Sequence, residues 1–147
     1  MSHTLDIQHF VFGTLHRENT INFENREALY RFIWKKLKEL KCHLYRINGM
    51  SDHVHIVVDV HPSISKAKLM QYLKTSSSHW MSQSGLFPNF CGWCSGYFSE
   101  SKDPESLDRI VNYVRNQETH HLGEDYIGEV KRLYNANGLD WDDRDML

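Results

Sequence analysis

The 147-residue chain is long enough for one sizeable core, and its 40% apolar and 24% charged residues exclude a disordered polypeptide. Its net charge of −2 is unevenly placed, because residues 1–117 carry 14 Lys and Arg against 11 Asp and Glu, whereas residues 118–147 carry 3 against 8. No run approaches the ~18 apolar residues of a membrane span, and the N-terminus lacks a basic region followed by an apolar run, so we expect a cytoplasmic protein with no membrane partner.

The first half of the chain predicts a strand, a helix and a hairpin. Residues 5–14 mix β-formers with alternating polar residues and predict a strand. An apolar stripe at helical spacing, capped by Asn22, predicts a helix over residues 23–41; the stripe is Leu29, Ile33, Leu37 and Leu40. Two strands, at 43–48 and 53–60, flank a turn at 49–52 and predict the hairpin.

The second half predicts two long helices, one strand and a final amphipathic segment. Pro62 with Ser63 or Ser65 starts a helix that ends near Met81, and residues 93–99 predict the fourth strand. Asp103-Pro104-Glu105 starts a helix that continues to about His121. A last helix covers residues 124–135, Gly138 ends it, and residues 138–147 form an acidic tail.

The order of elements is therefore βαββαβ followed by additional C-terminal helices. This order predicts an α+β, ferredoxin-like fold with a four-stranded antiparallel sheet and helices on one face. The chain contains no internal repeat and no linker, so we expect one domain over residues 1–147.

A histidine pair opens the third predicted strand. Residues two apart in a strand point to the same face, so His53 and His55 project together, whereas Val54, Ile56, Val58 and Val60 project to the opposite, apolar face. Tyr113 and Gln117 lie four residues apart on a predicted helix and are neighbours at the border of its apolar face. Two imidazoles and an amide oxygen would hold a divalent cation and leave positions open for water and substrate, as catalytic sites do. Either motif alone is common by chance.

Basic residues alternate with aromatic ones in two stretches, and such patches could contact phosphates and stack bases. The first stretch carries Arg31, Trp34, Lys35, Lys36, Lys38, Lys41 and Arg46, and the second carries Lys66, Lys68, Tyr72, Lys74 and Trp80. Helix surfaces often carry lysine without any such role, and that interpretation is equally open.

The three cysteines favour a reducing compartment over a disulfide framework. Cys91 and Cys94 form a CxxC pair, but the residues after it predict a strand and not the helix of a redox motif. A zinc site would need further ligands, for which His120 and His121 are the candidates, so structural cysteines are the favoured interpretation.

Four segments together resemble the HUH single-tyrosine transposases of the insertion-sequence 200/605 type, a family that includes the REP-associated tyrosine transposases. The segments are SDHVHIV at 51–57, LKTSS at 73–77, GYFS at 96–99 and IVNYVRNQETHH at 110–121. The resemblance extends from about residue 5 to residue 145. It is more specific than either the histidine pair or the tyrosine motif alone.

The resemblance implies a role for each matching residue. His53, His55 and Gln117 match the metal ligands, for Mg²⁺ or Mn²⁺, and Tyr113 matches the nucleophile that attacks single-stranded DNA and forms a 5′-phosphotyrosine. A homodimer in which Tyr113 acts in trans, and hairpin ends of a mobile or repeat element as the substrate, are also implied. As candidate DNA contacts we take Lys35, Lys36, Lys74, Trp80 and Arg115.

Two alternatives remain open. A domesticated relative could bind single-stranded or hairpin DNA without cutting it. A zinc-stabilised interaction module could use the cysteine pair with His120 and His121. A histidine-triad hydrolase is disfavoured, because it wants a third histidine where Val57 stands.

Overall fold

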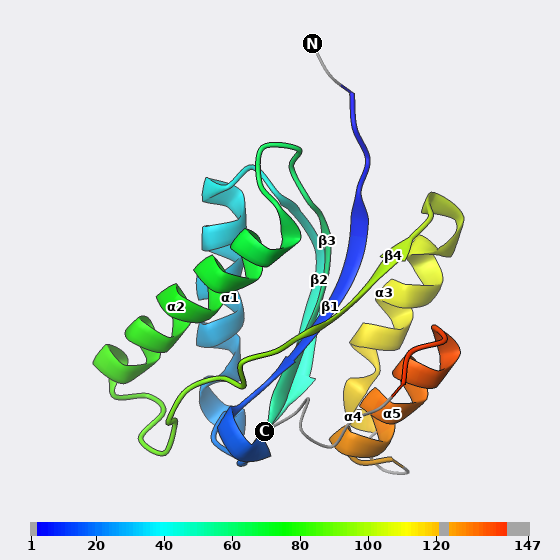
Figure 1. Ribbon diagram of the computed structural model, residues 1–147. Coiled ribbons are helices and arrows are strands. Elements are labelled where there is room, and N and C mark those ends of the chain that lie inside the picture. The colour runs from blue at the N-terminus through cyan, green and yellow to red at the C-terminus, as the bar shows by residue number, and fades with distance from the viewer. Residues whose placement is uncertain (1–2, 121–123, 141–147) are drawn as a thin grey trace.

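The sheet has four antiparallel strands in the order β2-β3-β1-β4, and the computed structural model describes residues 3–120 and 124–140 (Figure 1). The strands are β1 (Ile7–Gly13), β2 (His43–Met50), β3 (His53–Asp59) and β4 (Phe98–Lys102). β1 pairs antiparallel with β3 on one side and with β4 on the other, and β2 pairs antiparallel with β3. The predicted ferredoxin-like order is therefore confirmed.

Helices cover both faces of this sheet. On one face lie α1 (Arg26–Glu39) and α2 (Lys66–Ser84), and on the other lie α3 (Leu107–Arg115), α4 (Gln117–His120) and α5 (Tyr126–Ala136) (Figure 1). Short 3₁₀ turns at Leu15–Arg17, Phe23–Asn25 and Pro104–Ser106 connect the elements. The crossing helices lie on one face as predicted, and the C-terminal helices form a third layer. None of the helices in the described ranges is long and apolar enough to cross a membrane.

Side-chain caps fix where several of these elements begin. A side-chain oxygen accepts a hydrogen bond from the backbone N–H three residues on, which satisfies a donor that has no partner inside the helix. Asn22, Ser65, Asp103 and Asp125 make this contact with Asn25, Lys68, Ser106 and Gly128, respectively. Ser65, and not Ser63, therefore starts α2.

The main core fills the space between the sheet and the α1–α2 layer. It comprises alternate strand residues and the apolar stripes of both helices, among them Phe10, Phe12, Val54, Ile56, Val58, Leu29, Ile33, Leu37, Leu69 and Leu73. Each strand residue in this list is at most 1% exposed. Burying side chains of this size contributes roughly 1.5–3 kcal/mol each, so this layer holds the sheet in place.

The opposite face of the sheet has two smaller apolar clusters with polar residues between them. One cluster joins Val11 and Phe98 to α5, and the other joins Ile7 and Val57 to α3. His9, His53 and His55 lie on the same face and are fully buried. This face therefore encloses a buried polar site that the α3 and α5 layers close off from solvent.

Two predicted elements differ from the structure. The predicted strand at residues 93–99 is wrong over most of its length, because β4 starts at Phe98 and Trp93 makes only an isolated bridge with Thr14. Gly92, with φ of +126°, breaks the extended chain before Trp93, and the Cys94 amide donates to the Gly13 carbonyl.

The predicted helix through residue 121 also breaks, at Asn116, whose φ and ψ of −96° and 26° are not helical. The break separates Tyr113 on α3 from Gln117 on α4. Gln117 becomes fully buried instead of lying at the border of the apolar face, whereas Tyr113 is half-buried as predicted. His121 and residues 141–147 of the predicted tail lie outside the described residues.

Gly13 lets α5 approach the sheet, which generates a test of the fold. A Cβ on Gly13 would lie 2.8 Å from the ring of Tyr126, so we expect Gly13→Ala to cost about 1–3 kcal/mol through overpacking, measured by urea unfolding. In a Tyr126→Ala background the same change should cost much less, because the clashing ring is gone. Equal costs in the two backgrounds would contradict this contact.

Candidate metal centre

His53 and His55 point their Nε2 atoms at one carboxylate. The Nε2 of His55 lies 3.0 Å from Oε1 of Glu129, and the Nε2 of His53 lies 3.4 Å from the same oxygen. One ligand atom from each of these three residues falls within 4.8 Å of the others, and all three residues are buried. A cluster of this composition could hold a metal ion.

Glu129 connects the histidines to the tyrosine. It projects from α5 and is 0% exposed. Its Oε2 accepts hydrogen bonds from the hydroxyl of Tyr113 and, at 3.1 Å, from the side-chain amide of Gln117. Because a buried carboxylate without partners is very costly, these contacts fix how α5 docks on the sheet.

Gln117 completes the cluster from the other side. Its Oε1 lies 3.0 Å from Nε2 of His53 while its amide nitrogen donates to Glu129. The amide oxygen therefore faces the atom of His53 that a cation would contact. The structure brings the four residues His53, His55, Tyr113 and Gln117 together.

A second row of polar groups orients the histidines. The Nδ1 of His53 lies 2.7 Å from the Asp52 carboxylate, and the Nδ1 of His55 lies 2.8 Å from Nε2 of His9. The Nδ1 of His9 in turn lies 2.9 Å from Glu100 on β4. Such partners fix the ring orientation of metal-ligating histidines and direct the remaining nitrogen at the cation.

The hydrogen bonds also set the number of protons in the site. Asp52 and the Gln117 oxygen both accept, so His53 donates from both of its nitrogens and carries a positive charge. The His9–His55 pair lies between two carboxylates, those of Glu100 and Glu129, so each end of the pair faces an acceptor.

Burial and hydrogen bonding move the pKa values of the two candidate ligands in opposite directions. Burial disfavours a charged His53, but its hydrogen bonds to Asp52 and Glu129 outweigh that effect and raise its pKa to about 9. Burial dominates for His55 and lowers its pKa to about 3, despite the hydrogen bond to Glu129. His55 therefore stays neutral.

Tyr113 lies between Glu129 and Arg132. Its hydroxyl donates to Glu129 and accepts a hydrogen bond of 2.7 Å from Nη2 of Arg132. Burial and the Glu129 carboxylate raise the pKa of Tyr113 above its ordinary value, and the nearby Arg132 opposes that shift. The tyrosine is thus held protonated beside one acceptor for its proton and one cation.

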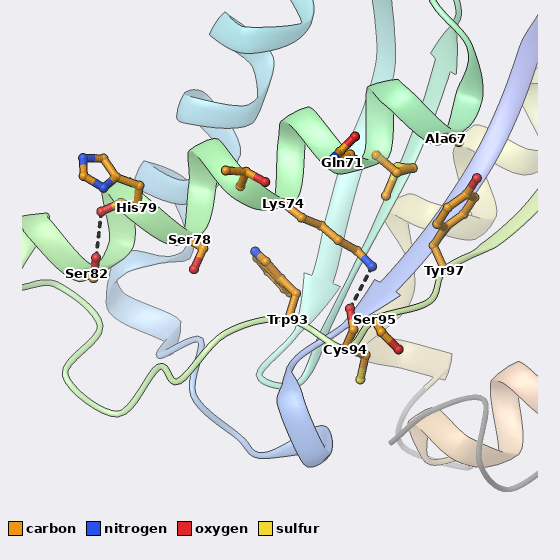
Figure 2. A pocket seen from close by; sticks show the side chains of 12 residues that line it. Ala67, Gln71, Lys74, Ser78, His79, Ser82, Trp93, Cys94, Ser95 and Tyr97 are labelled. Atoms are coloured by element: carbon orange, nitrogen blue, oxygen red, sulfur yellow. Dashed lines mark hydrogen bonds between the residues drawn. The ribbon is translucent and has the colours of Figure 1, made fainter.

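Lys74 is turned toward the loop before β4. Figure 2 shows its side chain extending from α2 toward this loop, and its Nζ donates to the carbonyls of Cys94 and Gly96 at 2.8 and 2.6 Å. Burial lowers the pKa of the amine. The lysine positions the segment that leads into β4, within a cavity of about 600 Å³ beside Trp93 and Tyr97.

Of the other candidate DNA contacts, two are exposed and two have partners within the protein. Lys35 and Arg115 are exposed. The Nζ of Lys36 lies 3.4 Å from Glu39, and Trp80 stacks on Phe32 with ring centroids 4.8 Å apart.

The cysteine pair does not assemble a metal cluster within the described part of the chain. Cys91 is exposed, whereas Cys94 is buried and its thiol donates to the Thr14 carbonyl. The predicted structural role fits Cys94. His121 and the side chain of His120 lie outside the described part of the structure.

Three residues of the site were not predicted from the sequence. Glu129 and Arg132 belong to the final amphipathic segment, where acidic and basic residues normally face solvent. His9 is the single histidine of β1, and it lies on the face of the sheet that α3 and α5 cover. A detectable signal for Glu129 was its place next to Val130 and one turn before Leu133, on the apolar side of that helix.

The fold and the site define an α+β protein with a candidate metal centre next to a tyrosine hydroxyl. Residues 3–117 match the family model described as "Transposase IS200 like". The chain is 27% identical over 126 residues to the IS200 transposases of Salmonella typhimurium LT2 and Salmonella typhi, across 82% of this chain and 80% of each relative. The chain therefore belongs to the IS200-like transposase family.

Two solved structures share the fold. A candidate transposase of Deinococcus radiodurans R1 matches with a TM-score of 0.61 and 20% identity, over 80% of this chain and 95% of that one. A REP-associated tyrosine transposase bound to a REP hairpin matches with a TM-score of 0.62 and 10% identity, over 82% of this chain and 73% of that one.

The charge of His53 predicts how a metal would bind. A divalent cation on Nε2 of His53 must displace the proton there, so we expect Mn²⁺ binding at pH 7 to release about one proton. Calorimetry in buffers of different ionisation enthalpy measures this number. Because the pKa of His53 is near 9, affinity should fall as the pH decreases from 9 to 6.

The carboxylate is tested separately. Glu129→Gln should weaken Mn²⁺ binding about 10–100-fold, the range seen when a supporting group of a metal site is lost. Glu105→Gln, a change at an exposed position, is the control. Binding that releases no protons, or that is indifferent to Glu129→Gln, would show that the metal binds elsewhere.

Proposed function

We propose that this transposase cuts and rejoins single-stranded DNA with Tyr113 as the nucleophile and a divalent cation at the histidine pair. The observation that carries the proposal is the sharing of Glu129. One of its oxygens faces His53 and His55, and the other accepts a hydrogen bond from the Tyr113 hydroxyl. A nucleophile, a proton acceptor and a cation site are thus adjacent.

The residues present fit a divalent cation. Two imidazole nitrogens with carboxylate and amide oxygens form a mixed set that suits Mn²⁺ and, through its oxygens, Mg²⁺. His53, His55 and either Gln117 or Glu129 would hold the ion. When bound, the cation would polarise the scissile phosphate and neutralise charge on its oxygens.

The chain's own side chains handle the proton and the nucleophile. Glu129 takes the phenolic proton, and Arg132 donates a hydrogen bond to the oxygen as it becomes negative. The Tyr113 oxygen attacks phosphorus, the bond from phosphorus to the 3′ oxygen breaks, and the leaving 3′ oxygen takes up the proton that Glu129 accepted. The products are a 5′-phosphotyrosine and a free 3′-hydroxyl.

The second step reverses the first with another strand. A 3′-hydroxyl attacks the phosphotyrosine, re-forms a phosphodiester and returns the proton to Tyr113. One phosphodiester replaces another throughout, so the reaction needs no nucleotide as an energy source.

Hairpin ends of a mobile or repeat element are the substrate that we propose. The structural relative bound to a REP hairpin supports this choice. We also propose DNA contacts by Lys35 and Arg115, which are exposed, with Lys36, Lys74 and Trp80 as further contacts. The homodimer remains a prediction. Within one chain the Tyr113 and His55 ring centroids are 5.9 Å apart. Tyr113 could therefore act at the histidine pair of its own chain (in cis) as well as at that of a partner (in trans).

A non-catalytic hairpin binder is the second candidate. The Tyr113–Glu129–Arg132 cluster favours catalysis over it, because simple DNA binding needs no proton acceptor at a tyrosine.

The nucleophile is tested by trapping. Wild-type protein with Mn²⁺ and labelled single strands from the gene's flanking DNA should form a covalent adduct on denaturing gels. Tyr113→Phe should form none, and EDTA should abolish the adduct. Tyr72→Phe, on α2, is the control. Tight hairpin binding without any adduct from wild type would favour the non-catalytic binder.

The raised pKa of Tyr113 predicts a pH dependence. Because the phenol is protonated at neutral pH, adduct formation at saturating Mn²⁺ should accelerate as the pH rises from 6 to 9. Arg132→Gln removes the cation that opposes the shift, and should slow the reaction about 10²-fold, as loss of one charge-stabilising donor does. Glu124→Gln, which removes the other partner of Arg132, should be far milder. A rate independent of pH would contradict deprotonation of Tyr113 in the limiting step.

A further inference from the structure

A cavity of about 510 Å³ lies beside β2, the outer strand of the sheet, and none of the candidate metal ligands lines it. Its walls come from α1, from β2 and from the region where α3 meets α4. The residues that matter are Arg26, Tyr30, Arg31, Trp34, Arg46 and Arg115. Its size falls within the range of ordinary ligand sites.

The cavity is positively charged. Four arginines line it against two acidic residues, Glu27 and Glu118. Arg26 lies 3.6 Å from Glu118, whereas in the described part of the chain the other three guanidinium groups have no acidic partner. Three arginines without an acidic partner are suited to bind an anion, and their planar donors match phosphate oxygens.

Two buried polar atoms in the cavity wall have no hydrogen-bond partner. They are Oη of Tyr30 and Nε of Arg46. Tyr30 is only 9% exposed, so its hydroxyl is cut off from most solvent. Native structures leave few such groups unsatisfied, so this wall of the cavity is unusually polar for a buried surface.

The cavity adjoins the metal centre through β2 and the helix break. Asn48 on β2 pairs with His55 in the sheet register and donates at 3.0 Å to the Arg115 carbonyl. Arg115 itself lies in the sequence between Tyr113 and Gln117. The turn of helix that carries Tyr113 therefore also supplies one wall residue of the cavity, whereas the Tyr113 ring itself borders a separate hollow beside Arg109 and Arg132.

We propose that this cavity binds the single-stranded DNA next to the cleaved phosphate, an inference that rests on the proposed function. Arg31, Arg46 and Arg115 pair with backbone phosphates. Trp34, 46% exposed at the rim, stacks on a base. The site is sequence-tolerant, because it reads phosphates and one aromatic face.

A second copy of the chain is the less suitable occupant of this edge. Around a two-fold axis the same arginines would meet each other, which is repulsive. The β-bulge between Leu44 and Arg46 also interrupts the ladder, as is common on strands that avoid edge-to-edge pairing.

The test measures binding without chemistry. All variants carry Tyr113→Phe and are assayed in EDTA by fluorescence anisotropy with a labelled, mixed-sequence 20-nucleotide single strand. Arg31→Gln with Arg115→Gln, both at exposed positions, should weaken binding about tenfold and reduce the salt dependence by about 1.4 in log–log slope, because two phosphate contacts are lost. Lys131→Gln, a change at an exposed position on α5 outside both basic stretches, is the control and should change affinity less than twofold.

Two further measurements keep the outcomes distinct. Trp34→Phe should remove part of the tryptophan quenching caused by the oligonucleotide, and Arg46→Gln, checked for folding by circular dichroism, should weaken binding as well. An unchanged affinity and slope in the arginine variants would overturn the proposal. So would a change from dimer to monomer without any DNA effect, which would make the cavity an interface between copies. Failure of the adduct assay with cavity-dependent binding intact would instead refute only the cleavage chemistry.

Discussion

The buried carboxylate of Glu129 is the group on which the rest of the site depends. An isolated carboxylate in this position would cost far more than the net stability of a small domain, so the chain surrounds it with donors. Tyr113 and Gln117 donate to one oxygen and His55 to the other, with His53 close by. These donors come from three elements, α3, α4 and β3. Each of these elements must therefore dock in register for the buried charge to be tolerated.

The same balance explains how one cluster can suit two states. Without a cation, the charge of His53 faces the carboxylates of Asp52 and Glu129. A divalent cation on Nε2 of His53 would take the place of a proton, so one positive group replaces another. The carboxylates that stabilise the protonated imidazole are thus also placed to stabilise a cation.

Local patterns predicted much of the fold because each pattern has a local cause. The alternation at His53–Val60 and the stripe from Leu29 to Leu37 follow from burial on one face, and both match the structure. The start of β4 and the break at Asn116 depend on contacts between distant segments. The Lys74 amine holds the loop before β4, and Gln117 reaches Glu129 only after the helix turns. The partners of these contacts lie 12 and 20 residues apart on different elements, so local periodicity does not report them.

The candidate site divides in the same way. His53 with His55 and Tyr113 with Gln117 are pairs at fixed spacing, so a sequence reveals them. Glu129 and His9 are single residues, and only the sheet register and the docking of α5 place them beside His55. Their types are also the least informative, since a glutamate on a helix is usually solvated. Parts of a site that orient, protonate or neutralise are therefore harder to find from sequence than its motif residues. Here they outnumber the motif, because burying a cation site against a sheet requires a partner for every charge it contains.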